Sequence, residues 1–199
     1  MKRIPHTTLA VLLGLAALAP LASTAAPAAT PPAPVQTLVP AGSEITFVAK
    51  QLGVPLIGRF KTFTAQLAFD PKQPQTSKVA FQINLGSVAV NADTDVELVK
   101  PEWFNTAKFP QATFQSVAIK AKGPGQFEVA GKLSLKGQTH DLVVPVQLTQ
   151  AQGLSTATGS FVLKRLDFKV GDGDWADPSV VANDVQVKFK LVLQGVPAL

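Results

Sequence analysis

Cysteine is absent from all 199 residues of the chain. A protein without cysteine forms no disulfides, so its fold must be stabilised by the burial of apolar surface. The same absence excludes a lipid anchor attached through cysteine, and it removes the thiolate ligands of a structural zinc site. The fold therefore depends on an apolar core of ordinary size.

Histidine is scarce as well. One of the two histidines lies among the first six residues, and the other, His140, stands in the turn-like stretch KGQTHD beside Asp141. Nothing in the sequence places a serine nucleophile near this pair, and a single histidine cannot supply the ligands of a zinc site. The carboxylate-rich stretch GDGDWADP at residues 171–178 lacks the ligand spacing and the distal glutamate of a calcium loop. We therefore predict no catalytic residue, no metal site and no cofactor.

The apolar run at residues 9–21 is too short to span a bilayer comfortably. Lys2 and Arg3 precede it and small residues follow it, which is typical of a secretory signal peptide. We expect cleavage near Ala25 and a periplasmic or secreted protein, with an uncleaved membrane tether as the alternative. The expected organisation is a signal peptide at 1–25, an Ala/Pro-rich linker at 26–37 and a single domain at 38–199.

A clustered basic face is also missing. The formal net charge is +5, but the cations are spread among carboxylates along the chain. Binding to nucleic acid needs such a cluster, so nucleic acid is excluded as a partner. A mild excess of positive charge is compatible with anionic lipid headgroups, and we expect peripheral contact with a membrane surface. A homodimer through edge strands is left open, because no motif specifies it.

What the chain does contain, from residue 43 onward, is alternation of apolar and polar residues. The segment VAFQINL at 79–85 is typical, and the same period recurs at 127–135, 142–148 and 185–193. Further strands are expected at 45–49, 65–69, 112–120, 155–164 and, as a short one, 166–170. Little helix is available to cover the apolar face, so the sheet must close on itself. We predict an all-β fold, an extended barrel of about eight antiparallel strands.

The alternation stops between residues 90 and 110. Asp93 or Asp95 is expected to cap a short helix that runs through Glu97 to Lys100, with Pro101 ending it. A cluster of aromatic residues follows the helix. A segment this apolar cannot lie open to water, so we expect it to form a lid over the barrel, with plain filling of the core as the alternative.

Several ordered motifs resemble the YceI-like family of exported lipocalin-like proteins. The most characteristic is NTAKFPQATF at 105–114. The stretch GRFKTF at 58–63 is similar to the family's G-x-F-x-x-F element, and VAGKLSLKGQTHDLVVPV at 129–146 to its Gly-x-Leu-x-Leu-x-Gly-x-Thr hairpin. Arg165, Asp167 and Phe168 match a late R-x-D-F element. Together the motifs cover residues 40–195, nearly the whole expected domain.

The resemblance implies a lipocalin-like barrel that carries a long-chain isoprenoid lipid, such as a polyprenyl phosphate or a quinone-type tail, in an apolar tunnel. Each buried methylene contributes about 0.8 kcal/mol, so a long tail needs no polar contact to be retained. The residues expected to line the tunnel are Phe47, Phe60, Phe63, Phe81, Ile83, Leu98, Trp103, Phe104, Phe109, Phe114 and Phe161.

The chain departs from the family pattern at two places. Family members often carry a histidine where this chain has Gln51, and a His-Leu-Arg run where it has Glu97, Leu98 and Val99. Headgroup recognition through those side chains is therefore in doubt here. The cations that remain nearby are Arg59, Lys100 and Lys108, and they are the candidate headgroup contacts.

Two other functions stay open. In the first, the protein is an envelope or stress protein whose barrel is filled by its own side chains and which acts through protein contacts. In the second, it is an enzyme acting on a lipid, for which His140, Glu97 and Asp167 would be the residues to test. A continuous apolar cavity in the structure would discriminate the carrier from the filled barrel.

Overall fold

The computed structural model describes residues 35–199. The expected signal peptide at 1–25 and residues 26–34 of the expected linker lie outside the described residues. The rest of the chain forms one antiparallel sheet with the strand order β3-β4-β6-β7-β8-β9-β10-β1-β2-β5. The strands are β1 (Thr37–Gln51), β2 (Val54–Phe60), β3 (Phe63–Ala68), β4 (Lys78–Asn84), β5 (Val88–Ala89), β6 (Gln111–Gly123), β7 (Gln126–Leu135), β8 (Gln138–Ala151), β9 (Leu154–Lys164) and β10 (Asp184–Gln194).

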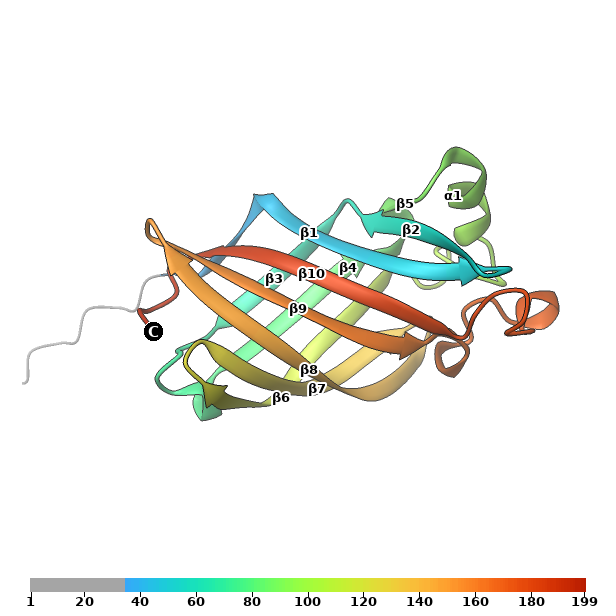
Figure 1. Cartoon of the computed structure of the whole chain (residues 1–199). Helices are drawn as coiled ribbons and strands as arrows, with labels where there is room; N and C mark the ends of the chain where they lie inside the picture. Colours follow the sequence, from blue (N-terminus) through green and yellow to red (C-terminus); the bar gives the residue numbers. More distant parts are fainter. Residues whose placement is uncertain (1–34) are drawn as a thin grey trace, which may run out of the picture. The chain divides into compact units, whose positions relative to one another are not determined.

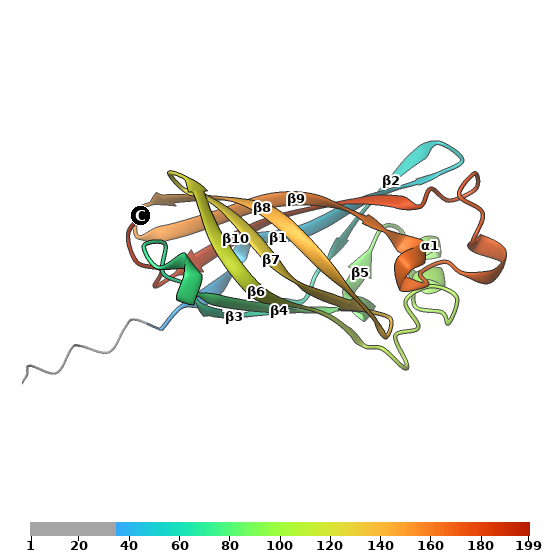
Figure 2. The same cartoon turned by 90° about the horizontal axis from the view of Figure 1, so that it is seen from below.

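The sheet curls into a half-barrel around an apolar interior (Figures 1 and 2). The all-β antiparallel architecture confirms the expectation, but the sheet has ten strands instead of eight. One reason is β2, where no strand was expected. Only residues 61 and 62 separate it from β3, yet β2 pairs with β1 and β3 pairs with β4. The other reason is β5, a strand of two residues that pairs with β2 at one end of the sheet.

The seam between β1 and β3 is joined by a side chain. The Nε2 of Gln36 donates to the carbonyl of Phe69 at 2.7 Å, and the amide of Phe69 donates to Oε1 of Gln36 at 2.9 Å. The amide group of Gln36 thus takes the place of a backbone partner just beyond the end of β3. Gln36 lies in the segment expected to be a linker, and β1 begins at Thr37.

Two-residue turns join three of the hairpins. Their first residues, Leu52, Lys136 and Gln152, have φ between 48° and 52°, and a glycine with positive φ follows each of them. Positive φ at both central positions gives the turn whose twist matches that of the flanking strands. These turns fix the register of β1–β2, β7–β8 and β8–β9.

The helix α1 (Ala92–Leu98) confirms that the irregular segment contains a short helix, but its limits differ from the prediction. Asn91, and not Asp93 or Asp95, is the N-cap, and its side chain accepts from the amide of Thr94 at 2.9 Å. The helix ends at Leu98, where the carbonyl of Leu98 accepts from the amide of Phe104 as the chain folds back. The structure describes no helix long and apolar enough to cross a membrane.

The strand expected at 166–170 is wrong. Residues Arg165–Phe168 form a 3-10 turn, and Lys169 ends it in the left-handed region with φ 54°. The loop from this turn to β10 lies at the same end of the sheet as α1, away from the C-terminus (Figures 1 and 2). Below, residues 99–110 are called the lid segment and residues 165–183 the β9–β10 loop.

Candidate functional site

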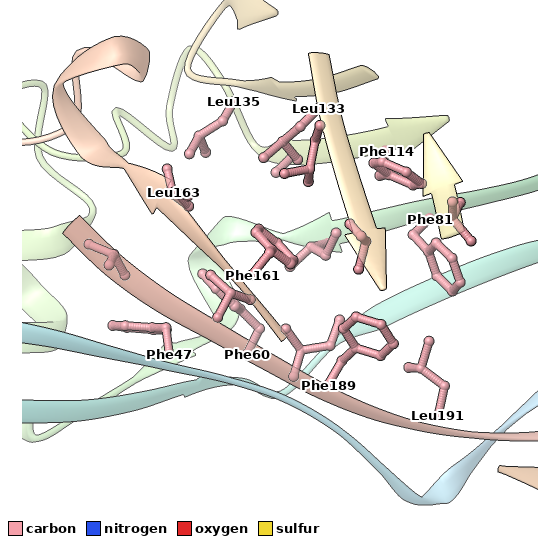
Figure 3. Close-up of a pocket in the computed structure, with 18 of the residues that line it drawn as sticks. Phe47, Phe60, Phe81, Phe114, Leu133, Leu135, Phe161, Leu163, Phe189 and Leu191 are labelled. Atoms are coloured by element: carbon pink, nitrogen blue, oxygen red, sulfur yellow. The ribbon is translucent and has the colours of Figure 1, made fainter. Parts of the chain in front are cut away.

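An apolar cavity of about 260 Å³ runs through the interior of the sheet. Its wall draws on both clusters of buried residues, one beside α1 around Leu85, Phe104 and Phe168, the other toward the C-terminus around Ile119 and Leu148. Figure 3 shows phenylalanine and leucine side chains from several strands pointing into the same space. An apolar cavity of roughly 150 Å³ already stays free of water and accepts a small hydrocarbon, so this volume is sufficient for a guest.

The alternation read from the sequence places the cavity wall correctly. The segments 79–85, 142–148 and 185–193 each send every second residue to the wall. Because successive side chains of a strand point to opposite faces, the outward positions of the same strands are mostly polar and exposed. The inward face is therefore decided locally, strand by strand.

Most of the residues expected to line a tunnel lie on the cavity wall. They are Phe47, Phe60, Phe81, Ile83, Leu98, Trp103, Phe104, Phe114 and Phe161. The two exceptions are Phe63, which packs against the buried cluster toward the C-terminus, and Phe109, whose ring covers Gly137 in the β7–β8 turn. Phe109 therefore packs the lid segment onto a hairpin instead of facing the cavity.

Glycines make room for three of the rings on the wall. A Cβ atom added to Gly58 would overlap the ring of Phe47 on the paired residue of β1, and one added to Gly159 would overlap Phe189. A Cβ atom added to Gly131 would overlap the ring of Phe114, although Gly131 pairs with Ser116 and Phe114 pairs with Leu133. Because each ring lies against its neighbouring strand, it occupies less of the interior, and the cavity stays open.

One charged side chain, Arg165, also lines the cavity, and only 3% of it is exposed. Its five N–H groups donate to the carbonyl oxygens of Val170, Gly171, Trp175, Val181 and Ala182, at distances of 2.5 to 3.1 Å. Burial lowers the pKa of the guanidinium from its ordinary value. The cation therefore holds the β9–β10 loop in place over the end of the cavity.

Lys136 is the second buried cation at this end. Its ammonium group donates to the carbonyls of Glu102 at 2.9 Å and Lys169 at 2.5 Å, and the carboxylate of Asp172 lies at 3.5 Å. These bonds tie the β7–β8 turn to the lid segment and to the β9–β10 loop. Sequence reasoning did not identify Lys136 or the burial of Arg165, because a charged residue beside a turn usually faces water.

Trp103 in the lid segment supplies an unsatisfied donor. Its Nε1 is the one buried side-chain nitrogen or oxygen of residues 35–199 that lacks a hydrogen-bond partner. Its ring lies 5.5 Å from that of Trp175 and against Gly171, so the lid segment and the β9–β10 loop meet here. A buried N–H without an acceptor costs free energy, which a ligand oxygen placed within reach would recover.

The three candidate headgroup cations lie outside the cavity wall. Arg59 is exposed on β2, Lys100 forms an ion pair with Glu97 at 2.5 Å, and Lys108 lies over the ring of Phe109 at 5.3 Å. The lid arrangement therefore leaves these three charges facing solvent. They are within reach only of a headgroup that projects out of the sheet.

The residues named for an enzyme are not assembled into a catalytic group. Nε2 of His140 lies 2.9 Å from the backbone carbonyl of Asp167, and its ring packs on Phe168. The neighbouring carboxylate, Asp141, bonds to Lys132, which lowers the pKa of Asp141. In the stretch GDGDWADP, a hydrogen bond with Ser179 lowers the pKa of Asp177. Within residues 35–199, no three His, Cys, Asp or Glu side chains lie close enough to hold a metal ion.

Comparison with known proteins agrees with this fold. A UPF0312 protein of Shewanella sp. (strain ANA-3) is 36% identical over 199 residues, covering 94% of this chain and 96% of the relative. Protein YceI of Salmonella arizonae is 39% identical over a shorter stretch that covers 52% of this chain and 55% of the relative.

Solved structures give the same result. The crystal structure of Burkholderia cenocepacia BcnA matches with a TM-score of 0.75 and 37% identity, covering 78% of this chain and 98% of that chain. A polyisoprenoid binding domain from Saccharophagus degradans shares the fold, with a TM-score of 0.65 at 17% identity over 82% of this chain and 99% of that one.

The family model described as the YceI-like domain matches residues 36–193. This range includes every strand that contributes to the cavity wall, as well as the lid segment and the β9–β10 loop. With the agreement in fold and in the order of the motifs, it shows that the chain belongs to the YceI-like family.

Proposed function

We propose that this protein is an exported carrier that binds a long-chain isoprenoid lipid, of the polyprenyl phosphate or quinone type, inside the sheet. The observation that carries the proposal is the cavity of about 260 Å³, whose wall is apolar apart from Arg165. A hydrocarbon tail completes the packing of such a wall, and each methylene that it buries contributes about 0.8 kcal/mol. The polyisoprenoid binding of the Saccharophagus degradans domain, which has the same fold, supports the choice of ligand.

The lipid's polar end is assigned to the α1 end of the cavity. The two wall residues with nitrogen-bearing side chains, Arg165 and Trp103, both belong to this end. The donors of Arg165 are taken up by carbonyls, whereas Nε1 of Trp103 has no acceptor. Nε1 of Trp103 is buried, so it would donate to an oxygen of the ligand only where the ligand reaches into the lid segment.

A binding role is favoured over a lipid-modifying enzyme, because the residues that would be tested for catalysis bond to structural partners. His140 contacts the backbone carbonyl of Asp167, and Glu97 forms an ion pair with Lys100. The cavity likewise argues against a barrel filled by its own side chains. Export to the periplasm or the medium is proposed from the first 25 residues alone.

Native mass spectrometry of the gently purified protein, followed by lipid extraction, tests the proposal. Val187 is an inward residue at the middle of β10, and its neighbour Gln186 points outward. Val187→Trp fills the cavity and should abolish the mass of a bound lipid, whereas Gln186→Trp should retain it. Recovery of empty protein from several growth conditions, or equal lipid content in both variants, would contradict the carrier function.

A further inference from the structure

The tip of the β1–β2 hairpin presents apolar side chains to water. Leu52, Val54 and Ile57 are 72%, 61% and 67% exposed. The equivalent two-residue turns of the other hairpins place polar residues, Lys136 and Gln152, where this one has Leu52. Below, the hairpin face means these three apolar residues at the tip together with the exposed cations Lys50 of β1, Arg59 of β2 and Lys188 of β10.

Leu52 costs the isolated protein free energy in two ways, through its backbone conformation and through its exposed side chain. Its φ of 49° lies in the left-handed region, which costs a residue with a Cβ free energy and which asparagine or glycine would adopt more easily. Its side chain also leaves apolar surface in water. Both costs point to a medium outside the protein in which this leucine is buried.

The cations of the hairpin face have no carboxylate partners within residues 35–199. Arg59 on β2 and Lys188 on β10 both pair in register with Thr46 of β1, and Lys50 lies four pairs closer to the tip. All three side chains are exposed, and none takes part in an ion pair. An apolar tip bordered by unpaired cations is complementary to an anionic lipid surface, in which the tip enters the apolar layer and the cations meet the headgroups.

A second copy of the chain fits this face less well. In a symmetric dimer the same patch meets itself, so that the cations of both copies would face each other across the contact. An anionic bilayer pairs with those charges instead of repelling them. The charges of the hairpin face therefore favour an anionic membrane over a second copy as the occupant.

The hairpin tip is also attached to the end of the cavity. The amide of Leu52 donates to the carbonyl of Val180 at 2.8 Å, and the amide of Ala182 donates to the carbonyl of Lys50 at 2.9 Å. Between them, Val181 is buried and lines the cavity. Val180 and Ala182 thus bond to the hairpin tip, while Val181 between them forms part of the cavity wall.

We propose that the hairpin face docks the protein on an anionic membrane surface, which places the α1 end of the cavity at the bilayer where lipid enters and leaves. The role of the docking rests on the proposed carrier function, but the docking itself is a property of the surface and is measured without cargo.

The test is co-sedimentation of the purified protein with vesicles of phosphatidylcholine and phosphatidylglycerol, with pure phosphatidylcholine vesicles as the reference. Binding should require the anionic lipid and should weaken as salt shortens the Debye length to about 3 Å near 1 M. Each of Arg59→Gln and Lys188→Gln should weaken binding about fivefold, the effect of one cation near a charged membrane.

The most informative variant is Leu52→Asn. Asparagine suits the left-handed conformation, so the variant should melt at the same or a higher temperature, while vesicle binding falls about tenfold through the loss of the inserted side chain. Matched controls are Val117→Asn and Lys120→Gln on β6, away from β1 and β2 in the strand order. Val117 is 71% exposed, like Leu52, and both controls should bind as the parent does.

Three results would overturn the docking proposal: unchanged binding of Leu52→Asn, equal losses in the controls on β6, or equal binding to both kinds of vesicle. Sedimentation of the protein alone tests whether the hairpin face binds a second copy instead. If Leu52→Asn abolishes self-association and leaves vesicle binding unchanged, the face is a dimer contact and the docking proposal is wrong. Lipid content identifies failure of the carrier function separately, because Leu52→Asn should still copurify with lipid.

Discussion

Individual residues decide how much room the interior has. Glycine at positions 58, 131 and 159 allows the rings of Phe47, Phe114 and Phe189 to lie against neighbouring strands. The three sites differ in what surrounds them. At Gly58 the closest atoms all belong to the ring, whereas a Cβ at Gly131 or Gly159 would also meet a backbone oxygen at 2.5 or 2.6 Å. Gly58 is therefore the site where a substitution moves a ring and leaves the backbone in place.

Gly58→Ala should push the ring of Phe47 into the cavity. Overpacking of this kind costs about 1–3 kcal/mol of the free energy of unfolding. Urea denaturation measures that cost, and native mass spectrometry should show less bound lipid. The double variant Gly58→Ala, Phe47→Leu should recover both properties, because the smaller side chain removes the overlap. Undiminished lipid content in the single variant would show that the ring does not limit the cavity.

Trp103 allows the polar end of the ligand to be tested. Trp103→Phe removes the N–H donor and keeps an aromatic ring in the lid segment. Affinity for a polyprenol or quinone should fall by about 1 kcal/mol, roughly fivefold, whereas affinity for a hydrocarbon of the same length without oxygen should not change beyond the packing effect. Titration calorimetry, which does not depend on tryptophan fluorescence, measures the affinity for both ligands. Equal losses for the two ligands would mean that Nε1 does not contact the ligand.

Three elements meet at the α1 end of the sheet: the lid segment, the β7–β8 turn and the β9–β10 loop. Two buried cations hold them together through backbone carbonyls. Lys136 of the β7–β8 turn bonds to the lid segment and to the β9–β10 loop, and Arg165 bonds to several carbonyls within the β9–β10 loop. A planar group with five donors can satisfy five carbonyls at once, which an ammonium group cannot. The geometry of this end of the cavity therefore depends on the arginine itself and not only on its charge.

Arg165→Lys should loosen the β9–β10 loop. The variant retains the charge but leaves buried carbonyls without donors, at a cost of about 1–3 kcal/mol for each unsatisfied group. Amide hydrogen exchange should become faster at Val170, Gly171 and Val181, while the amides of β7 and β8 near Val129 and Val144 stay protected. Uniformly faster exchange across the sheet would instead indicate global destabilisation, and unchanged exchange in the loop would contradict the role of Arg165.

At the scale of the whole molecule, the proposed carrier function makes the stability of the curled sheet depend on what occupies its apolar cavity. Ligand that binds only the folded state adds RT ln(1 + [L]/Kd) to the free energy of unfolding. The packing of the inward side chains and the occupancy of the cavity are therefore coupled, and stability should report on cargo.

Removal of the lipid should lower the melting temperature. Free ligand at one hundred times its dissociation constant stabilises by about 2.7 kcal/mol, which corresponds to several degrees for a domain of this size. Calorimetry before and after extraction with detergent or solvent measures the difference, and Val187→Trp provides the control because its filled cavity should make extraction inconsequential. Identical melting curves for extracted and unextracted protein would mean that no lipid occupies the cavity.

The sequence predicted some features of the fold because they are local. Alternation assigned the inward residues of β4, β8 and β10 correctly, since the side-chain period of a strand does not depend on its partners. The strand count was wrong mainly at β2, because no strand was expected between 49 and 65, and the pairing of residues 54–60 with β1 appears only in the structure. The strand expected at 166–170 was wrong for a related reason, because the left-handed Lys169 and the buried Arg165 turn the chain there.

The sequence by itself determined family membership, the inward faces of β4, β8 and β10 and the absence of disulfides, because motifs, side-chain period and composition are all properties of neighbouring residues. Only the tertiary structure decided that the interior is open, that Arg165 and Lys136 are buried, and that Leu52 is left in water. Each of these depends on contacts between residues far apart in the chain. The volume of a cavity is the small difference between the space that a curled sheet encloses and the space that its side chains fill, and cross-strand pairs such as Gly58 and Phe47 set that difference.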